Sequence, residues 1–389
     1  MFSKRTEWKL TPNRFTQVQA ELRAAGMEVL DLSVSNPTRA GLHYDDEAIL
    51  EALVQPEAMD YDPQPKGLLA ARQGVTRYYH DAHGLFGLDP ESLVLTTSTS
   101  EGYSYVFRLL SNPDDEILVP KPSYPLFEFL ADLEDVKLVP YPLLYDSGWQ
   151  IDFPSLYKAV NHRTRAVVVV HPNNPTGSYA TPAEVEALNQ FCAEYNLALI
   201  IDEVFLDYAH DGAPRSSFVA NDEVLTFTLS GLSKISGLPQ MKVAWVATSG
   251  PQERKREALA RLEVIADTYL SMNAPLQLAV PVLLDQRKSI QPLLLDRVRN
   301  NLQDLDYQLA RQKSCERLRV DGGWYVILRV PALQSDEDLA IDLLRKVAVL
   351  VHPGHFYDFP KDGYLVLSLI TPTETFREGI GRILEVLNN

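Results

Sequence analysis

Short apolar runs alternate with amphipathic stretches through much of the chain. The runs are rich in Val, Ile and Leu and nearly continuously apolar, which is typical of strands buried on both faces of a parallel sheet. Stretches with helical periodicity, at residues 101–110, 126–133 and 182–195, lie between several of them. The pattern predicts an α/β fold with a mostly parallel sheet covered by helices. The seven predicted strands are residues 93–97, 116–119, 136–140, 166–170, 198–202, 224–229 and 241–247.

The pattern changes after residue 247. Long helical stretches are followed by short apolar runs that are spaced for two or three strands. We expect a large domain at residues 46–275 and a smaller α+β domain built from residues 1–45 and 276–389. The elements expected near the N-terminus and after residue 247 are helices at 11–26, 252–267, 274–312, 336–346 and 375–387 and strands at 29–34, 324–330, 347–352 and 364–369.

Composition and charge narrow the classes of function. The 389 residues are 46% hydrophobic and carry a net charge of −16, so nucleic acid or an anionic membrane is an unfavourable main partner. No apolar run approaches the roughly 18 residues of a membrane span, and the N-terminus lacks the apolar core of a signal peptide. Cys192, Cys315 and the eight histidines lack the spacing of metal ligands. We expect a cytoplasmic protein that holds no metal and binds neither nucleic acid nor membrane.

Polar, small or aromatic residues follow the carboxyl ends of the predicted strands. Ligands of parallel α/β sheets bind at these ends, so side chains from separate strands are expected to meet there. Together they could enclose an anionic, planar ligand. The segments are residues 96–100, 122–124, 171–177, 202–203 and 230–234.

One of these segments presents a lysine directly after an apolar strand. Lys234 lies in a loop rich in Gly and Ser, and a second lysine, Lys242, follows a little further on. A desolvated lysine amine has a lowered pKa and can form a Schiff base with an aldehyde. A loop lysine that simply reaches solvent is the alternative, and the lysine alone does not decide between them.

The motifs together resemble the class I and II aminotransferases, which are pyridoxal-phosphate enzymes of fold type I. The matching residues are His-Pro-Asn-Asn-Pro-Thr-Gly at 171–177, Asp202-Glu203, and Ser233-Lys234 followed by Lys242. The resemblance implies a sheet with one antiparallel strand and pyridoxal 5'-phosphate as cofactor. It implies that Lys234 forms the Schiff base and moves the substrate proton, that Asp202 faces the pyridine nitrogen, and that Asn174 donates to the phenolic oxygen.

The resemblance also assigns the remaining cofactor contacts. Tyr124 would stack on the ring, while Thr99 and Ser100 would hold the phosphate at a helix N-terminus. Ser233 and Lys242 would complete the phosphate site, with Lys242 in the place of the usual arginine. Tyr61 resembles a tyrosine that reaches the phosphate of a neighbouring subunit, which implies a homodimer with active sites at its interface.

Several positions depart from the family pattern. Ser98 replaces a glycine and Gly231 a serine, so one phosphate contact is expected to be missing. Phe205 stands where a tyrosine usually donates to the phenolic oxygen, and Val366 stands where an arginine usually binds the substrate carboxylate.

Without this arginine, the family pattern does not identify the residue that binds the substrate carboxylate. Asn36 and Arg39, in a turn-rich loop, are the predicted substrate residues, with Arg39 as the replacement cation for a carboxylate. The alternative is a substrate without a carboxylate at that place. Arg377 and Lys66 are weaker candidates, because charged residues on helices and loops are mostly solvated.

The predicted function is a ping-pong transfer of an amino group from an amino acid or amine donor to a keto acid. A pyridoxal-phosphate lyase, decarboxylase or cyclase acting on an unusual amino acid is the alternative, because the same scaffold supports these reactions. A non-catalytic regulator is a third hypothesis. The acidic charge and the joint presence of Lys234, Asp202 and Asn174 argue against it.

Overall fold

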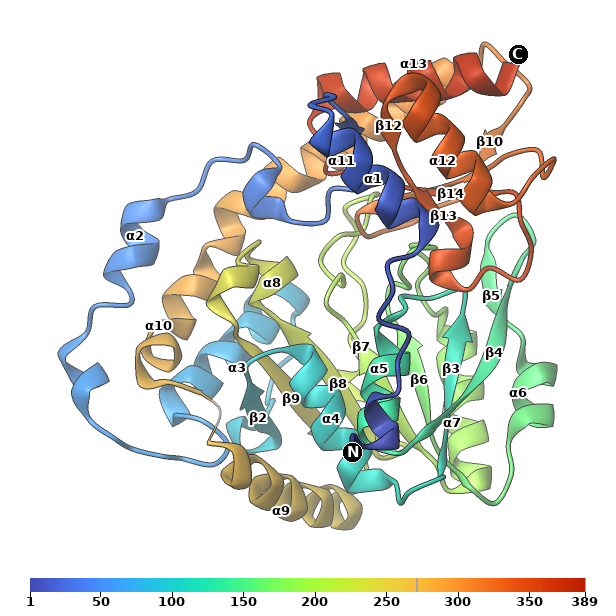
Figure 1. The fold of residues 1–389 in the computed structure, drawn as a ribbon. Coiled ribbons are helices and arrows are strands. Elements are labelled where there is room, and N and C mark those ends of the chain that lie inside the picture. Colours follow the sequence, from blue (N-terminus) through green and yellow to red (C-terminus); the bar gives the residue numbers. More distant parts are fainter. Residues whose placement is uncertain (271, 389) are drawn as a thin grey trace.

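The computed structural model describes residues 1–270 and 272–388. Its main element is an eight-stranded sheet in the order β2-β9-β8-β7-β6-β3-β4-β5 (Figure 1). β9 is antiparallel to both neighbours, and β5 forms an antiparallel hairpin with β4. The predicted sheet is confirmed, and β5 is an eighth strand at its edge. The strands are β2 (Leu93–Thr96), β3 (Glu116–Lys121), β4 (Lys137–Tyr145), β5 (Trp149–Ile151), β6 (Thr164–Val170), β7 (Ala198–Asp202), β8 (Thr226–Gly231) and β9 (Ala244–Ser249).

Helices cover both faces of this sheet because its central strands are apolar on both sides. On one face, α4, α5 and α9 pack on side chains such as Ile117 and Val168. On the other face, α6 and α7 pack on Leu118 and Val167, which are the neighbouring residues of the same strands. α3 and α10 pack beside β2 and β9. The helices are α3 (Leu69–His83), α4 (Thr99–Leu110), α5 (Leu126–Leu133), α6 (Phe153–Ala159), α7 (Pro182–Tyr195), α9 (Gln252–Tyr269) and α10 (Ala274–Asp285).

A second, smaller layer joins the two ends of the chain. Its antiparallel sheet has the order β10-β11-β14-β13, and β1 pairs in parallel with β12 beside it. The N-terminal helix α1 packs on α12, and both helices share one core with α13 (Figure 1). The elements are α1 (Arg14–Ala24), β1 (Leu30–Asp31), β10 (Glu316–Arg317), β11 (Tyr325–Arg329), α12 (Asp336–Val347), β12 (Val349–Leu350), β13 (His352–Pro353), β14 (Tyr364–Ser368) and α13 (Thr373–Asn388).

The helical stretch predicted at 274–312 is two helices, α10 and α11 (Arg287–Leu309), which meet at Gln286. α10 shares a core with α3 of the large layer, whereas Leu294 and Val298 of α11 belong to the core of the small layer. We propose two domains with this helix junction between them, so that α10 belongs to the large domain. The short helix α2 (Asp46–Glu51) also packs with the large layer, through Ile49.

The described residues contain no cluster of three or more His, Cys, Asp or Glu side chains that could hold a metal ion. None of the helices formed by residues 1–270 and 272–388 is both long and apolar enough to cross a membrane. Cys192 and Cys315 are free thiols, and burial raises the pKa of both, to about 11 for Cys315. Both thiols are therefore protonated at neutral pH.

Candidate active site

A cavity of about 320 Å³ opens at the carboxyl ends of the parallel strands, as the topology of the sheet requires. Its walls come from loops that follow separate strands of the large sheet and from the small layer. Six of the predicted site residues line it: Thr99, Tyr124, Asn174, Asp202, Ser233 and Lys234.

Lys234 lies in the short helix α8 (Leu232–Ile235), directly after β8. Its backbone is held by the hydroxyl of Tyr208, which donates a 2.7 Å hydrogen bond to the Lys234 carbonyl oxygen. Burial lowers the pKa of the lysine to about 8, and the charge of Asp202 opposes this shift. At pH 7 about a tenth of the amine is therefore unprotonated, a far larger fraction than for an exposed lysine.

Gly231 allows β8 to lead into this helix beside β9. A Cβ atom at this position would lie 2.7 Å from the carbonyl oxygen of Val243 and 2.9 Å from Cα of Ala244, both backbone atoms of the adjacent segment. The serine that the family pattern has at this position would not fit without a shift of the β9 backbone. The close approach of two strands thus explains this departure.

Asp202 is the last residue of β7, and its carboxylate is buried beside two donors. The Val204 amide donates to Oδ1 over 3.1 Å, and the Tyr103 hydroxyl donates to Oδ2 over 3.2 Å. Burial raises the pKa of Asp202 to about 6, although these two donors and the charge of Lys234 oppose the shift. The two donors hold the carboxylate in place, and a further positive or hydrogen-bonding partner would stabilise its charged form.

Asn174 is held by a loop that also contacts the neighbouring strand end. The His171 amide donates to the carbonyl oxygen of Asp202 over 2.7 Å, which ties this loop to the end of β7. Gly177 has a φ of 68°, and a Cβ atom there would lie 2.4 Å from the Gly322 carbonyl oxygen. The Oδ1 atom of Asn174 is buried without a hydrogen-bond partner among the described residues. Its amide oxygen can therefore accept a hydrogen bond from a bound molecule.

The N-terminus of α4 borders the cavity. Ser98 caps the helix by accepting from the Glu101 amide over 3.2 Å, and the Glu101 carboxylate accepts from the Thr97 amide over 2.6 Å. Thr99 and Ser100 form the first turn, whose N–H groups have no partner within a helix and favour an anion. Ser98, which replaces the family's glycine, therefore serves as the helix cap.

The sequence of this chain matches the model of the family "Aminotransferase class I and II" over residues 27–383. The chain belongs to the class I and II aminotransferase family. It is 27% identical over 379 residues to a glutamate-pyruvate aminotransferase AlaA of Haemophilus influenzae, and the match covers 95% of this chain and 93% of that protein. It is 28% identical to an alanine aminotransferase of Mycobacterium tuberculosis, with 94% and 87% covered. The chain is an aminotransferase.

Solved structures show the same fold. An alanine aminotransferase from Pyrococcus furiosus matches over 100% of both chains with a TM-score of 0.89 at 23% identity. An aspartate aminotransferase of Thermus thermophilus matches over 99% of both chains with a TM-score of 0.86 at 22% identity. At these identities the likeness shows a shared fold, which is the two-layer arrangement described above.

Five predicted residues of this aminotransferase do not line the cavity. Ser100 lies one residue beyond its wall, and Lys242 is exposed in a left-handed conformation with no ion pair to any described residue. Tyr61 is 82% exposed and lines a separate hollow of about 500 Å³. Asn36 accepts hydrogen bonds from the Thr38 amide and hydroxyl, and Arg39 is exposed. From the loop that holds these last two residues, only Ser35 reaches the cavity.

The wall that the small layer contributes to the aminotransferase site was not predicted from the sequence. Tyr325, His352 and Tyr357 line the cavity together with Tyr103 of α4. No local motif marks these residues, because their place depends on how the small sheet docks on the large one. The one available signal is the position of Tyr325 and His352 in or beside apolar runs that were predicted as strands.

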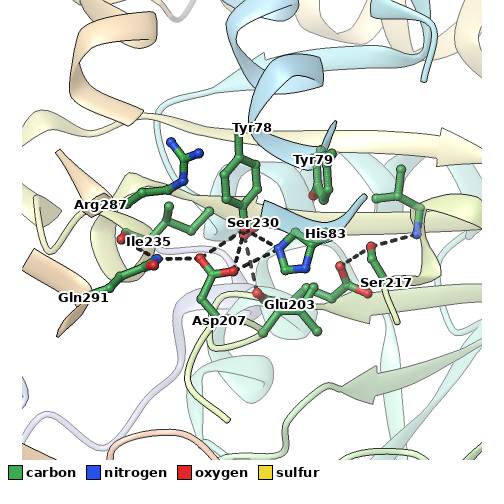
Figure 2. A network of polar contacts seen from close by, with 12 residues as sticks. Tyr78, Tyr79, His83, Glu203, Asp207, Ser217, Ser230, Ile235, Arg287 and Gln291 are labelled. Atoms are coloured by element: carbon green, nitrogen blue, oxygen red, sulfur yellow. Dashed lines mark hydrogen bonds and ion pairs between the residues drawn. The ribbon is translucent and has the colours of Figure 1, made fainter. Parts of the chain in front are cut away.

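A buried polar network supports the loop between Asp202 and Tyr208 from behind (Figure 2). Asp207 accepts from the Gln291 amide over 2.6 Å, and its other oxygen lies 2.9 Å from Nε2 of His83. Gln291 also donates to the carbonyl oxygen of Ile235, directly after Lys234. The network thus connects α3, α11 and the loop after β7 to the helix that holds the lysine of this aminotransferase.

Proposed function

We propose that this aminotransferase uses pyridoxal 5'-phosphate to move an amino group from an amino acid or amine donor to a keto acid by a ping-pong mechanism. The observation that carries the proposal is the arrangement of Lys234 and Asp202. A buried amine with a pKa of about 8 and a buried carboxylate with a pKa of about 6 line one cavity at the strand ends. Such shifted groups are suited to proton transfer near neutral pH.

The residues of the cavity fit this cofactor. When bound, it supplies an aldehyde for the amino group and a ring that accepts electrons when the α-carbon loses its proton. Asp202 would hold the ring nitrogen, and the Nδ2 group of Asn174, which lines the cavity, would donate to the ring oxygen. Tyr124, 46% exposed at the mouth of the cavity, would cover one face of the ring. A carboxylate beside the ring nitrogen and an amide N–H beside the ring oxygen match a protonated nitrogen and a negatively charged oxygen.

Four residues are proposed to hold the phosphate. Thr99 and Ser100 offer the N–H groups of the first turn of α4, and the Ser233 hydroxyl lines the cavity next to Lys234. Lys242 would add a positive charge from outside the wall. A lysine supplies a point charge rather than the two-pronged contact of an arginine, so its contribution depends more strongly on salt.

Lys234 is the proposed catalytic base and acid. Its amine would take the proton from the α-carbon of the donor and deliver it to the C4′ carbon of the cofactor, and in the second half-reaction it would move a proton in the opposite direction. Burial serves this role because it keeps part of the amine unprotonated and limits competition from water. Asn36 and Arg39 remain proposed substrate residues, although Arg39 would need a movement of its loop to reach the cavity.

We propose small amino acids as donors, because the named relatives act as alanine or glutamate-pyruvate aminotransferases. A lyase, decarboxylase or cyclase is the second candidate, favoured by one observation. Val366 is buried where the family pattern has its carboxylate-binding arginine, so the usual anchor of the donor is missing.

We also propose a cytoplasmic homodimer with Tyr61 reaching the site of the partner subunit. Tyr61 and the apolar residues around it line a hollow on the surface of one chain, which a second copy would cover. Sedimentation of the wild type and of Tyr61→Phe with and without cofactor tests this proposal. A monomer at micromolar concentration would contradict it.

The main experiment is a donor panel without acceptor, followed by the absorbance of the bound cofactor. Conversion to the aminated cofactor with L-alanine or L-glutamate supports the proposal, and release of ammonia without conversion of the cofactor indicates a lyase. Lys234→Ala should reduce the turnover rate by about 1000-fold or more. Lys288→Ala, 61% exposed on α11, is the control and should turn over like the wild type. A wild type that binds no cofactor would refute the proposal.

A further inference from the structure

The wall that faces the substrate contains few basic groups. Among the described residues that line the cavity, the only lysine is Lys234, there is no arginine, and the only histidine is His352. An amino acid donor has a carboxylate that must lose water on entering this space, and a buried carboxylate needs a positive or hydrogen-bonding partner. The small layer supplies the histidine.

The register of the small sheet places this histidine beside the position of the missing arginine. His352 of β13 is the direct antiparallel partner of Val366 of β14, and Ile327 of β11 pairs with Val366 on the other side. Directly paired residues of antiparallel strands project to the same face. Tyr325 pairs with Ser368 two residues further along these strands, so it shares this face and also lines the cavity. The face that carries Val366 is therefore the face turned towards the site.

A second residue holds the imidazole in place. Nδ1 of His352 lies 3.1 Å from the hydroxyl of Tyr357, which belongs to the short helix η7 (Gly354–Tyr357) and also lines the cavity. This contact occupies Nδ1 and leaves Nε2 as the ring nitrogen for a ligand. The imidazole N–H group of His352 and the nearby hydroxyl of Tyr357 are both groups that can donate a hydrogen bond to a carboxylate.

The charges around the imidazole decide when it is positive. Burial lowers the pKa of His352, and the charge of Asp31 in β1 opposes the shift. Tyr357 contacts its ring, and the other titratable groups that line the same cavity are Tyr103, Tyr124, Asp202, Lys234 and Tyr325. A carboxylate that enters beside His352 would favour the imidazolium, so binding of the carboxylate is coupled to uptake of a proton.

We propose that His352, oriented by Tyr357, binds the α-carboxylate of the amino donor in the place of the arginine that Val366 replaces. The inference rests on the proposed aminotransferase function with pyridoxal 5'-phosphate. It assigns to this site a donor that carries a carboxylate, and it explains how the chain retains such donors without a guanidinium. It also gives the site a pH dependence that an arginine would not produce, since an arginine stays charged.

The experiment compares His352→Gln and Tyr357→Phe with the wild type in the cofactor-loaded protein. His352→Gln should raise KM for L-alanine about tenfold, as expected for a lost hydrogen bond to a charged group, with kcat within about threefold. Tyr357→Phe keeps the ring, removes the hydroxyl and should raise KM by a smaller factor. KM of the wild type should increase with pH as the imidazole loses its proton, and this slope should be absent in His352→Gln.

The control is His355→Gln, because His355 is exposed in the same segment and does not line the cavity. The proposal would be overturned if KM for L-alanine is unchanged in His352→Gln. It would also be overturned if the tenfold increase in KM occurs in Arg39→Ala and not in His352→Gln. Inhibition by propionate, which has the carboxylate without the amine, gives a second reading, and its Ki should increase with KM. If none of the tested donors converts the wild type to the aminated cofactor, the proposed function is refuted as well. Failure of the aminotransferase function is thus distinguished from failure of the role of His352 alone.

Discussion

The ammonium nitrogen of Lys234 lies 4.9 Å from the centre of the Trp324 ring. Trp324 is fully buried and directly precedes β11 of the small layer, whereas Lys234 follows β8 of the large sheet. The environment of the proposed catalytic amine is therefore completed by the small layer. An aromatic face next to an amine favours the charged form, against the effect of burial.

Replacing Trp324 by Phe should lower the pKa of Lys234 further below its present value of about 8. Phe has a weaker negative face than Trp, so the protonated amine loses part of its stabilisation, about 0.5 kcal/mol. The measurement is the pH dependence of pyridoxal 5'-phosphate uptake by the stripped protein. Its midpoint should shift to lower pH in Trp324→Phe and stay unchanged in Trp8→Phe, since Trp8 packs on Phe129 on the exposed surface. A shift to higher pH contradicts this account.

Phe205→Tyr should lower the pH at which the absorbance of the bound cofactor changes. Phe205 is buried, lines the cavity and lies 5.4 Å from the Lys234 nitrogen, so a hydroxyl added to this ring can enter the site. A donor to the phenolic oxygen favours the deprotonated form of the bound group. Absorbance titration measures the midpoint.

Tyr208→Phe is the matched control for Phe205→Tyr. The Tyr208 hydroxyl donates to the backbone of Lys234, so it is not the missing ring donor, and its loss should leave the titration midpoint in place. A midpoint that is unchanged in Phe205→Tyr would show that position 205 does not reach the phenolic oxygen.

Glu203→Gln should make stability less dependent on pH. Glu203 is buried, accepts from the Ser217 hydroxyl and the Phe218 amide, and burial raises its pKa from 4.5 to about 7. The folded state therefore keeps a proton that the unfolded state has lost, and stability decreases as pH rises from 4.5 to about 7. One pKa unit corresponds to about 1.4 kcal/mol. Urea unfolding across this range should give a flatter profile in Glu203→Gln, and the same slope as the wild type in the exposed control Glu186→Gln.

The His83–Asp207 pair should show strong coupling in a double-mutant cycle with His83→Gln and Asp207→Asn. The two side chains are only 5% and 7% exposed, so each single change removes one member of a buried ion pair and should cost about 3 kcal/mol. Burial lowers the pKa of His83, but the hydrogen bond and charge of Asp207 outweigh this and raise it. The His83 imidazole is therefore protonated at pH 6, and the pair weakens as pH rises through the raised pKa of His83.

The control for this cycle is the exposed pair His80–Asp81, with side chains that are 49% and 38% exposed. Its coupling energy should be about 0.5 kcal/mol or less, because solvent screens it. Urea unfolding at pH 6 measures both cycles. Equal coupling in the two pairs would mean that the buried network does not stabilise the loop behind Lys234.

The sequence predicted the part of the molecule that follows from local pattern. Continuous apolar runs predicted the seven main strands, and the rule for parallel sheets brought Asn174, Asp202 and Lys234 to one edge. β5 was missed because three residues with alternating exposure carry little hydrophobic signal. The break at Gln286 was missed because this residue keeps helical dihedral angles, so nothing in the periodicity marks it.

The substrate wall could not be predicted in the same way. Tyr325, His352 and Tyr357 reach the cavity only through the docking of the small sheet on the large one, which no local periodicity encodes. Arg39, predicted from the loop that holds it, lies outside the cavity for the same reason. The register between the short strand β13 and its neighbour β14 decides which side chain lies beside Val366.

The pairing of β1 with β12 has a consequence for biosynthesis. Leu30 and Asp31 are synthesised before the strands of the large sheet, whereas their partners Val349 and Leu350 are synthesised after them. The strands of the large sheet, β2 to β9, are complete while the first residues still lack their partner. The segment with Leu30 and Asp31 therefore stays without its partner until β12 has been synthesised, and the small layer can close over Lys234 only after that.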